Sequence, residues 1–205
     1  MDAPTQKNTF DGPLGTSNSK RIRPSGGYRR LRSFQAATVI YDATVSFCAR
    51  FLDQRSRTVD QMVQAARSGR QNITEGSRAS ATSTQTELRL VNVARASLDE
   101  LLLDYEDFLR QRGLALWKKE DPKAKEIRRV AYNSDKSYVS YKSYFEVDVP
   151  EIAANAGICL IHQANYLLDR QLRQLDKEFL EQGGFTEKLH RMRTQHRQTE
   201  KETIR

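Results

Sequence analysis

The sequence predicts an all-α protein: an antiparallel four-helix bundle with an inserted short helix and loop, and with basic, partly disordered tails. Apolar residues recur at three- and four-residue steps in four long segments, which is the spacing of one helix face. The 205 residues include only 5 Pro and 10 Gly. The polar residues are mainly Arg, Gln, Glu, Lys and Asp, and this composition favours helices over short strands and turns.

The first predicted helix covers residues 28–52 and presents a coiled-coil-like seam. The seam residues are Leu31, Phe34, Thr38, Tyr41, Val45, Cys48 and Leu52. A second helix is predicted from Thr58, which would form a capping box with Gln61. Its apolar face continues to Ile73, and Gly76 is interpreted as the left-handed residue that ends it.

The third predicted helix starts at a cap among Ser83, Thr84 and Thr86 and ends at Gly113. Residues 113–150 are interpreted as an insertion that contains a short helix near 123–132 and a Tyr-rich stretch. The aromatic residues of that stretch either pack onto the bundle or stack on unpaired bases. Pro150 suits the first turn of the last helix, which we expect to end at Gly183 and Gly184.

Charge divides the chain into a disordered basic leader (1–27), the bundle (28–184) and a basic C-terminal tail (185–205). The net charge is +8. Residues 1–32 hold seven basic and two acidic residues, residues 187–205 hold six and three, and the rest is neutral. Basic ends on a neutral body indicate capture of RNA or DNA through counterion release, although such tails can also serve solubility alone. The candidate phosphate-binding residues are Lys20, Arg21, Arg23, Arg29, Arg30, Arg32, Arg67, Arg70, Arg78, Lys188, Arg191, Arg193 and Arg197.

Several classes of function find no support in the sequence. There is no phosphate-binding glycine loop, no nucleophile elbow and no triad arrangement of the three His. Cys159 and His162 are three residues apart, but two ligands do not make a metal site. We therefore expect no enzyme activity, no metal and no cofactor. Without a secretory signal or a long apolar run, we expect a cytoplasmic protein with free thiols at Cys48 and Cys159 and no membrane partner.

Residues 28–112 resemble a known family. The motifs are Gln61, Ala65-Ala66, Asn72-Ile73-x-Glu75-Gly76 and Ser97-Leu98-x-Glu100-Leu101. They resemble the four helix bundle proteins related to the 23S rRNA intervening-sequence protein and to the accessory variability determinant of diversity-generating retroelements. The second half resembles a C-terminal suffix found on some members. The resemblance implies a homopentamer with a nucleic-acid-binding surface and, for the retroelement branch, a reverse-transcriptase partner.

The chain departs from that pattern at the start of the second helix. Val63 and Gln64 stand where the family has basic residues, and Gly69 and Arg70 stand where it has Ile-Pro. Arg67, Arg70 and Arg78 could compensate.

We assign structural roles to four residues of the motifs. Asn72 and Glu75 would bond backbone groups around the helix end at Gly76, and Glu100 would pair with Arg67 or Arg95 if it is buried. Two functions follow from the sequence: a non-catalytic, oligomeric nucleic-acid-binding accessory protein, or a protein-protein interaction scaffold that binds no nucleic acid.

Overall fold

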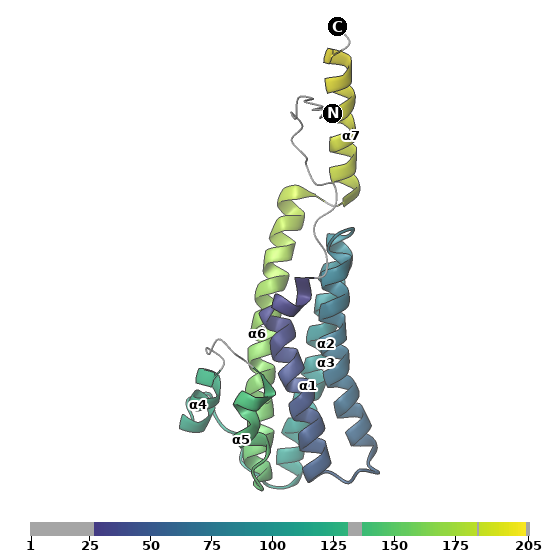
Figure 1. Cartoon of the computed structure of the whole chain (residues 1–205). Coiled ribbons are helices and arrows are strands. Elements are labelled where there is room, and N and C mark those ends of the chain that lie inside the picture. The colour runs from purple at the N-terminus through teal and green to yellow at the C-terminus, as the bar shows by residue number, and fades with distance from the viewer. Residues whose placement is uncertain (1–26, 131–136, 184, 204–205) are drawn as a thin grey trace, which may run out of the picture.

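The computed structural model describes residues 27–130, 137–183 and 185–203, and within these ranges it contains helices and no strand (Figure 1). The prediction of an all-α protein is confirmed. Apart from Gly27, the predicted disordered leader lies outside the described residues, as do Lys20, Arg21 and Arg23.

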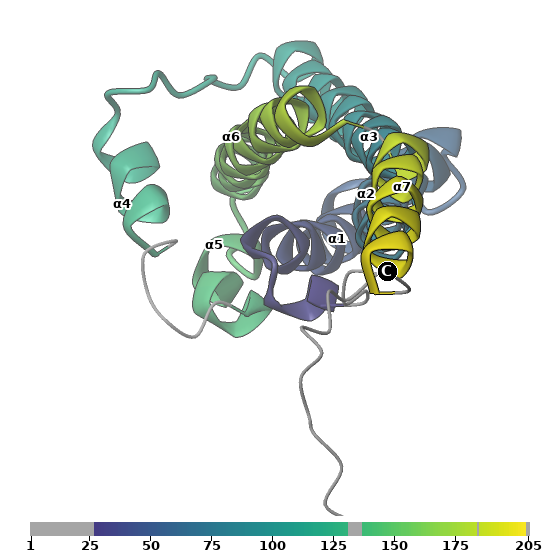
Figure 2. The same cartoon turned by 90° about the horizontal axis from the view of Figure 1, so that it is seen from above.

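Four long helices form the centre of the molecule: α1 (Arg32–Phe51), α2 (Arg57–Ala79), α3 (Thr84–Gln111) and α6 (Pro150–Gln182). A 3-10 helix, η1 (Gly27–Arg30), precedes α1. Each central helix packs against two others, since α1 and α3 both contact α2 and α6 (Figure 2). Successive central helices run in opposite directions along the long axis (Figure 1).

Most predicted helix ends agree with the structure. The Oγ of Ser83 accepts a hydrogen bond from the backbone N–H of Thr86 at 3.1 Å and caps α3. Gly113, with φ of 63°, follows the end of α3, and Pro150 occupies the first turn of α6. The predicted capping box at Thr58 is wrong, because Ser56 is the N-cap of α2 and its Oγ accepts from the N–H of Thr58 at 3.2 Å.

Gly76 does not end the second helix. Helix α2 continues to Ala79, and among the described glycines only Gly113 and Gly183 have positive φ. A Cβ at Gly76 would lie 3.4 Å from the Cβ of Leu90 on α3. Gly76 therefore lies inside a continuing helix at ordinary contact distance from α3, and the sequence interpretation of Gly76 as a left-handed stop is wrong.

The core is formed by one contiguous set of apolar side chains from all four central helices. Phe47 of α1 lies at its centre, with its ring centroid 4.8 Å from those of Tyr105 and Phe108 of α3. The hydroxyl of Tyr105 donates to Oγ1 of Thr44 at 3.1 Å, so this buried polar group is satisfied. Burial is also the main cause that raises the pKa of the Cys48 thiol to about 12.

The predicted seam of α1 is rotated relative to the observed one. The buried side includes Ser33, Ala37, Ile40, Thr44 and Phe47. Of the predicted seam residues, Cys48 is buried, Val45 is 41% exposed, and the other five are half-buried. Small residues at 33, 37 and 44 let the neighbouring helices approach closely, which a search for bulky apolar residues cannot detect.

The insertion forms α4 (Pro122–Val130), η2 (Tyr138–Tyr141) and α5 (Lys142–Phe145), beside the lower half of α6 (Figure 1). Tyr141 and Phe145 are buried in the core, so the aromatic cluster packs onto the central helices, as one of the two sequence alternatives expects. The short helix ends at Val130, while residues 131–136 lie outside the described part.

The segment before α4 is held by the fully buried Asn155 of α6. Its Oδ1 accepts from the N–H of Trp117 at 2.8 Å, and its Nδ2 donates to the carbonyls of Ala115 and Glu151 at 2.8 and 2.9 Å. One amide therefore satisfies three backbone groups and ties residues 115–117 to α6.

The C-terminal tail differs from its prediction. Residues Phe185–Thr203 form a helix, α7, where the sequence analysis predicted none. Gly183, with φ of 70°, separates α6 from α7, which confirms the predicted end of the last long helix.

Candidate nucleic-acid interface

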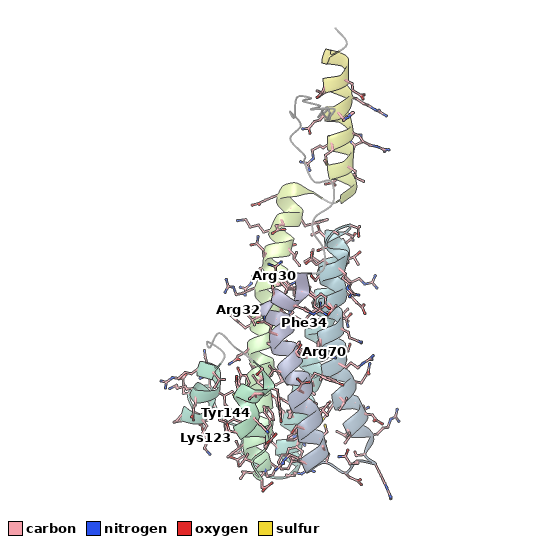
Figure 3. All side chains as sticks on the ribbon, in the orientation of Figure 1. Arg30, Arg32, Phe34, Arg70, Lys123 and Tyr144 are labelled. Atoms are coloured by element: carbon pink, nitrogen blue, oxygen red, sulfur yellow. The ribbon has the colours of Figure 1, made fainter. Side chains whose placement is uncertain are left out.

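The sequence-predicted basic residues that the structure describes lie on four elements. Arg29 and Arg30 belong to η1, Arg32 starts α1, Arg67, Arg70 and Arg78 lie on α2, and Lys188, Arg191, Arg193 and Arg197 lie on α7. Figure 3 labels Arg30, Arg32 and Arg70 around the upper part of α1, above Lys123 and Tyr144 on α4 and α5.

Two of these arginines converge on one aromatic ring. The guanidinium carbon of Arg29 lies 5.0 Å, and that of Arg78 lies 5.7 Å, from the ring centroid of Tyr28. Tyr28 is buried, with its ring edge-on to Phe34 at 4.9 Å. The aromatic ring offsets part of the repulsion between the two cations and holds η1 beside the end of α2.

Arg70 lies lower on α2, with its guanidinium carbon 4.2 Å from the ring centroid of Tyr41 on α1. Asp42 follows Tyr41 in the chain and has its pKa raised by burial, and the positive charge of Arg70 partly opposes that shift. Arg67 precedes Arg78 by eleven residues, close to three whole turns, so the two lie on the same side of α2.

The ion pairs of the described residues occur elsewhere. They include Arg95 with Asp99 and Asp169, Arg110 with Asp107, and Arg50 with Asp148. Six arginines of η1, α1 and α2, which we call the upper arginines, take part in none of the ion pairs between described residues: Arg29, Arg30, Arg32, Arg67, Arg70 and Arg78. Their charge is therefore not neutralised by a salt bridge within this part of the protein.

Arg191, Arg193 and Arg197 of α7 are exposed. Arg193 and Arg197 are four residues apart and share one side of the helix, while Arg191 lies on another. His196 contacts Glu200 at 3.5 Å between Nδ1 and Oε1. The helix therefore distributes its cations around the axis and does not gather them into one stripe.

The motif residue Asn72 has a position that differs from the predicted one. It donates to the carbonyl and Oγ of Ser68 at 3.0 and 3.2 Å, one turn back in α2. The Oγ of Ser68 lies 2.9 Å from that of Ser97 on α3. Asn72 therefore bonds a backbone group, as predicted, and supports a polar link between two helices. Its predicted place at a helix end is wrong, because α2 continues to Ala79.

Glu75 and Glu100 are both exposed. The predicted place of Glu75 at a helix end is also wrong, since α2 continues to Ala79. The condition for pairing Glu100 with an arginine is not met, because α3 turns Ser97, Leu98 and Leu101 toward the core. Arg95 instead contacts the neighbouring Asp99 and, on α6, Asp169.

Sequence reasoning missed a second basic surface on α6. Arg170, Arg173 and Lys177 follow one another at steps of three and four residues, so they share one helix side. They line a hollow of about 800 Å³ together with Arg32 of α1. The charge spacing in the sequence could have indicated this side, but its pairing with α1 depends on the tertiary fold.

No group of three or more His, Cys, Asp or Glu that could hold a metal occurs within residues 27–130, 137–183 and 185–203. Cys159 is half-buried and His162 is exposed, so the two side chains are not enclosed together in the core. In the same part of the chain, no helix combines the length and apolar character that crossing a bilayer requires.

Comparisons with models of protein families, with curated proteins and with solved structures find no match to this chain. The resemblance to the four helix bundle family stays a prediction from the sequence motifs.

Proposed function

We propose that this chain is a non-catalytic, oligomeric accessory protein of the cytoplasm that binds RNA or DNA phosphates, with its central helices forming an antiparallel four-helix bundle. The observation that carries the proposal is the convergence of Arg29 and Arg78 on Tyr28, with Arg70 lower on α2. Arg29 and Arg78 take part in no ion pair between described residues, so their mutual repulsion costs stability that a bound anion would recover.

The mechanism is electrostatic capture. Each arginine that meets a phosphate releases condensed counterions, so the affinity falls steeply with salt and depends little on base sequence. Oligomerisation would multiply the effect by placing several copies of the surface on one strand. A reverse transcriptase is the partner that the sequence resemblance implies, and the bound nucleic acid would be presented to it.

The test is fluorescence anisotropy of the full-length protein with a labelled RNA hairpin and a labelled duplex DNA over a salt series. A variant with Arg29, Arg70 and Arg78 changed to Gln should bind more weakly and show a flatter salt dependence, by roughly one unit of slope for each phosphate that no longer meets an arginine. The matched control changes three exposed arginines that take no part in the upper group: Arg55, Arg57 and Arg89. Equal losses in both variants, or no binding by the parent protein, would contradict the proposal.

Substitution is preferable to deleting the basic N-terminal segment through residue 32. Tyr28 is buried and Leu31 packs against the core, so such a deletion would remove packing as well as charge.

A second candidate function, a protein-interaction scaffold, has an observation of its own. Leu103 and Val93 on α3 are 62% and 41% exposed, although both are large apolar residues. With the exposed Ala96 they lie along one side of α3. This side suits contact with another protein, either a further copy of the chain or a different partner, and such binding would respond weakly to salt.

A further inference from the structure

A cavity of about 710 Å³ lies between α1, α6 and the inserted segment that contains α4. Its inner wall is apolar and includes Val39, Ile158 and Leu160, all buried. Leu116 and Trp117 of the segment before α4 also line it. The volume lies within the range of cavities that accept organic ligands, roughly 300–1,000 Å³.

The cavity continues into the basic hollow along α6. Arg32, Tyr166, Leu167 and Arg170 line both of them, so the two adjoin, and we call them together the α1–α6 groove. Its apolar part lies beside the insertion, and its polar part follows α6 toward Lys177. At the junction Tyr166 is 59% exposed, an unusual exposure for an aromatic side chain at the mouth of an apolar cavity.

The charges that line the groove are strongly one-sided. Glu106 is its one acidic lining residue among those described, against seven cations: Arg32, Lys118, Lys119, Arg128, Arg170, Arg173 and Lys177. Three of the cations already have partners, since Lys177 pairs with Glu181 at 3.7 Å, Arg128 donates to the carbonyl of Lys119, and Nε of Arg173 donates to the carbonyl of Asp169 at 3.1 Å. Arg32 and Arg170, at the junction, take part in no ion pair between described residues.

We infer that the α1–α6 groove binds single-stranded nucleic acid, with an unstacked base in the apolar cavity beside Tyr166 and the adjoining phosphates on Arg32, Arg170 and Arg173. The inference rests on the proposed function. It specifies that the nucleic acid is single-stranded, and it places a second binding site away from the arginines around Tyr28. A base inside a duplex cannot enter a cavity, whereas an aromatic ring beside a row of cations suits a single strand. The charge alone would attract any polyanion. The apolar cavity is therefore the feature that favours a single strand over a duplex.

The stacking part of the inference is tested on the full-length protein by anisotropy, with a labelled oligothymidylate of about 16 nucleotides and the corresponding duplex. We expect tighter binding of the single strand. Tyr166→Ala should weaken that binding about tenfold, because it removes the ring on which a base stacks. Tyr166→Phe keeps the ring and should bind like the parent. An oligonucleotide of abasic residues should bind the parent about as weakly as oligothymidylate binds Tyr166→Ala.

The phosphate part is tested with Arg170→Gln, which should lower the salt slope for the single strand by about 0.7. The matched control is Arg89→Gln on α3, where the side chain is exposed and distant in sequence from the groove. Thermal melting followed by circular dichroism verifies that each variant folds like the parent.

The outcomes separate the two proposals. If the parent binds neither single strand nor duplex, both fail. If it binds duplex and single strand equally, and Tyr166→Ala and Arg170→Gln bind like the parent, the groove inference fails while nucleic-acid binding by the upper arginines stands. If the small amphipathic anion anilinonaphthalene sulfonate binds and oligothymidylate does not displace it, the cavity serves a small molecule and the inference is overturned.

Discussion

Two glycine residues of the central helices differ in how closely a neighbouring helix approaches them. A Cβ at Gly157 of α6 would lie 2.8 Å from Cζ of Tyr105, which is held by its hydrogen bond to Thr44. A Cβ at Gly76 of α2 would meet its nearest neighbour, the Cβ of Leu90, at 3.4 Å, which is ordinary contact. The same residue type therefore has different tolerance at the two positions.

This difference predicts opposite effects of alanine. Gly76→Ala should raise the free energy of unfolding by about 0.5–1 kcal/mol, since alanine favours the helix and the contact is tolerable. Gly157→Ala should lower it by about 1–3 kcal/mol, because the rigid Tyr105 ring cannot move away. Urea denaturation followed by circular dichroism measures both. Loss of stability in Gly76→Ala would instead show that α3 lies too close to Gly76 for a methyl group to be accommodated.

At the scale of helices, the sequence predicts where a helix begins and ends better than which of its sides is buried. The ends at Ser83, Gly113, Pro150 and Gly183 follow from local chemistry, so residue type alone identifies them. The rotation of α1 does not, since its buried side contains Ser33 and Thr44, whose place depends on partners such as Gln171 and Tyr105. The helix α7 was missed because its sequence has few apolar residues to set a period.

For the candidate site too, the sequence predicts which residues share a helix but not which helices bring them together. The presence of Arg67, Arg70 and Arg78 on one helix could be expected from their spacing in the sequence. The meeting of Arg78 with Arg29 across Tyr28 depends on how η1 packs against α2. The junction of Arg32 with Arg170 joins residues far apart in the chain, and no local pattern predicts such a contact.

Asn155 makes the shortest hydrogen bonds between α6 and the segment before α4, at 2.8 Å, and the Glu151 carboxylate accepts two longer ones from Ala115 and Trp117 at 3.4 and 3.3 Å. Asn155→Ala would leave the N–H of Trp117 and the carbonyl of Ala115 without their partner, at a cost of about 1–3 kcal/mol. We expect residues 113–121 to detach from α6 before the central helices unfold. The chain contains one Trp, so its fluorescence should shift to longer wavelength while the helical circular dichroism is retained. The exposed Asn92 on α3 offers the control Asn92→Ala, and unchanged Trp emission in Asn155→Ala would contradict the prediction.

At the scale of the whole molecule, the upper arginines and Arg170, Arg173 and Lys177 of α6 gather toward one end of the central helices. The start of α1 and the last third of α6 adjoin at this end of the central helices. Toward the other end, Asp104 and Asp107 lie together on α3. There burial, and after it the negative charges of Asp107 and Glu100, raise the pKa of Asp104. A polyanion would therefore approach the basic end, which leaves the outer side of α3 available for contacts between copies.

That arrangement predicts how the proposed oligomer forms. Leu103 is 62% exposed on α3, and a charge there would be costly inside an interface but harmless in solvent. Leu103→Glu should convert the oligomer to monomers in sedimentation velocity, with no change in thermal stability beyond that caused by the loss of assembly. Leu180→Glu is the control, because Leu180 is 76% exposed on α6, away from that side. A parent protein that is already monomeric would contradict the proposed oligomer. A Leu103→Glu variant that sediments like an oligomeric parent would show that the interface lies elsewhere. The monomeric variant can then be tested for nucleic-acid binding. If it binds more weakly than the parent while the salt dependence for each chain is unchanged, several copies hold one strand in the parent.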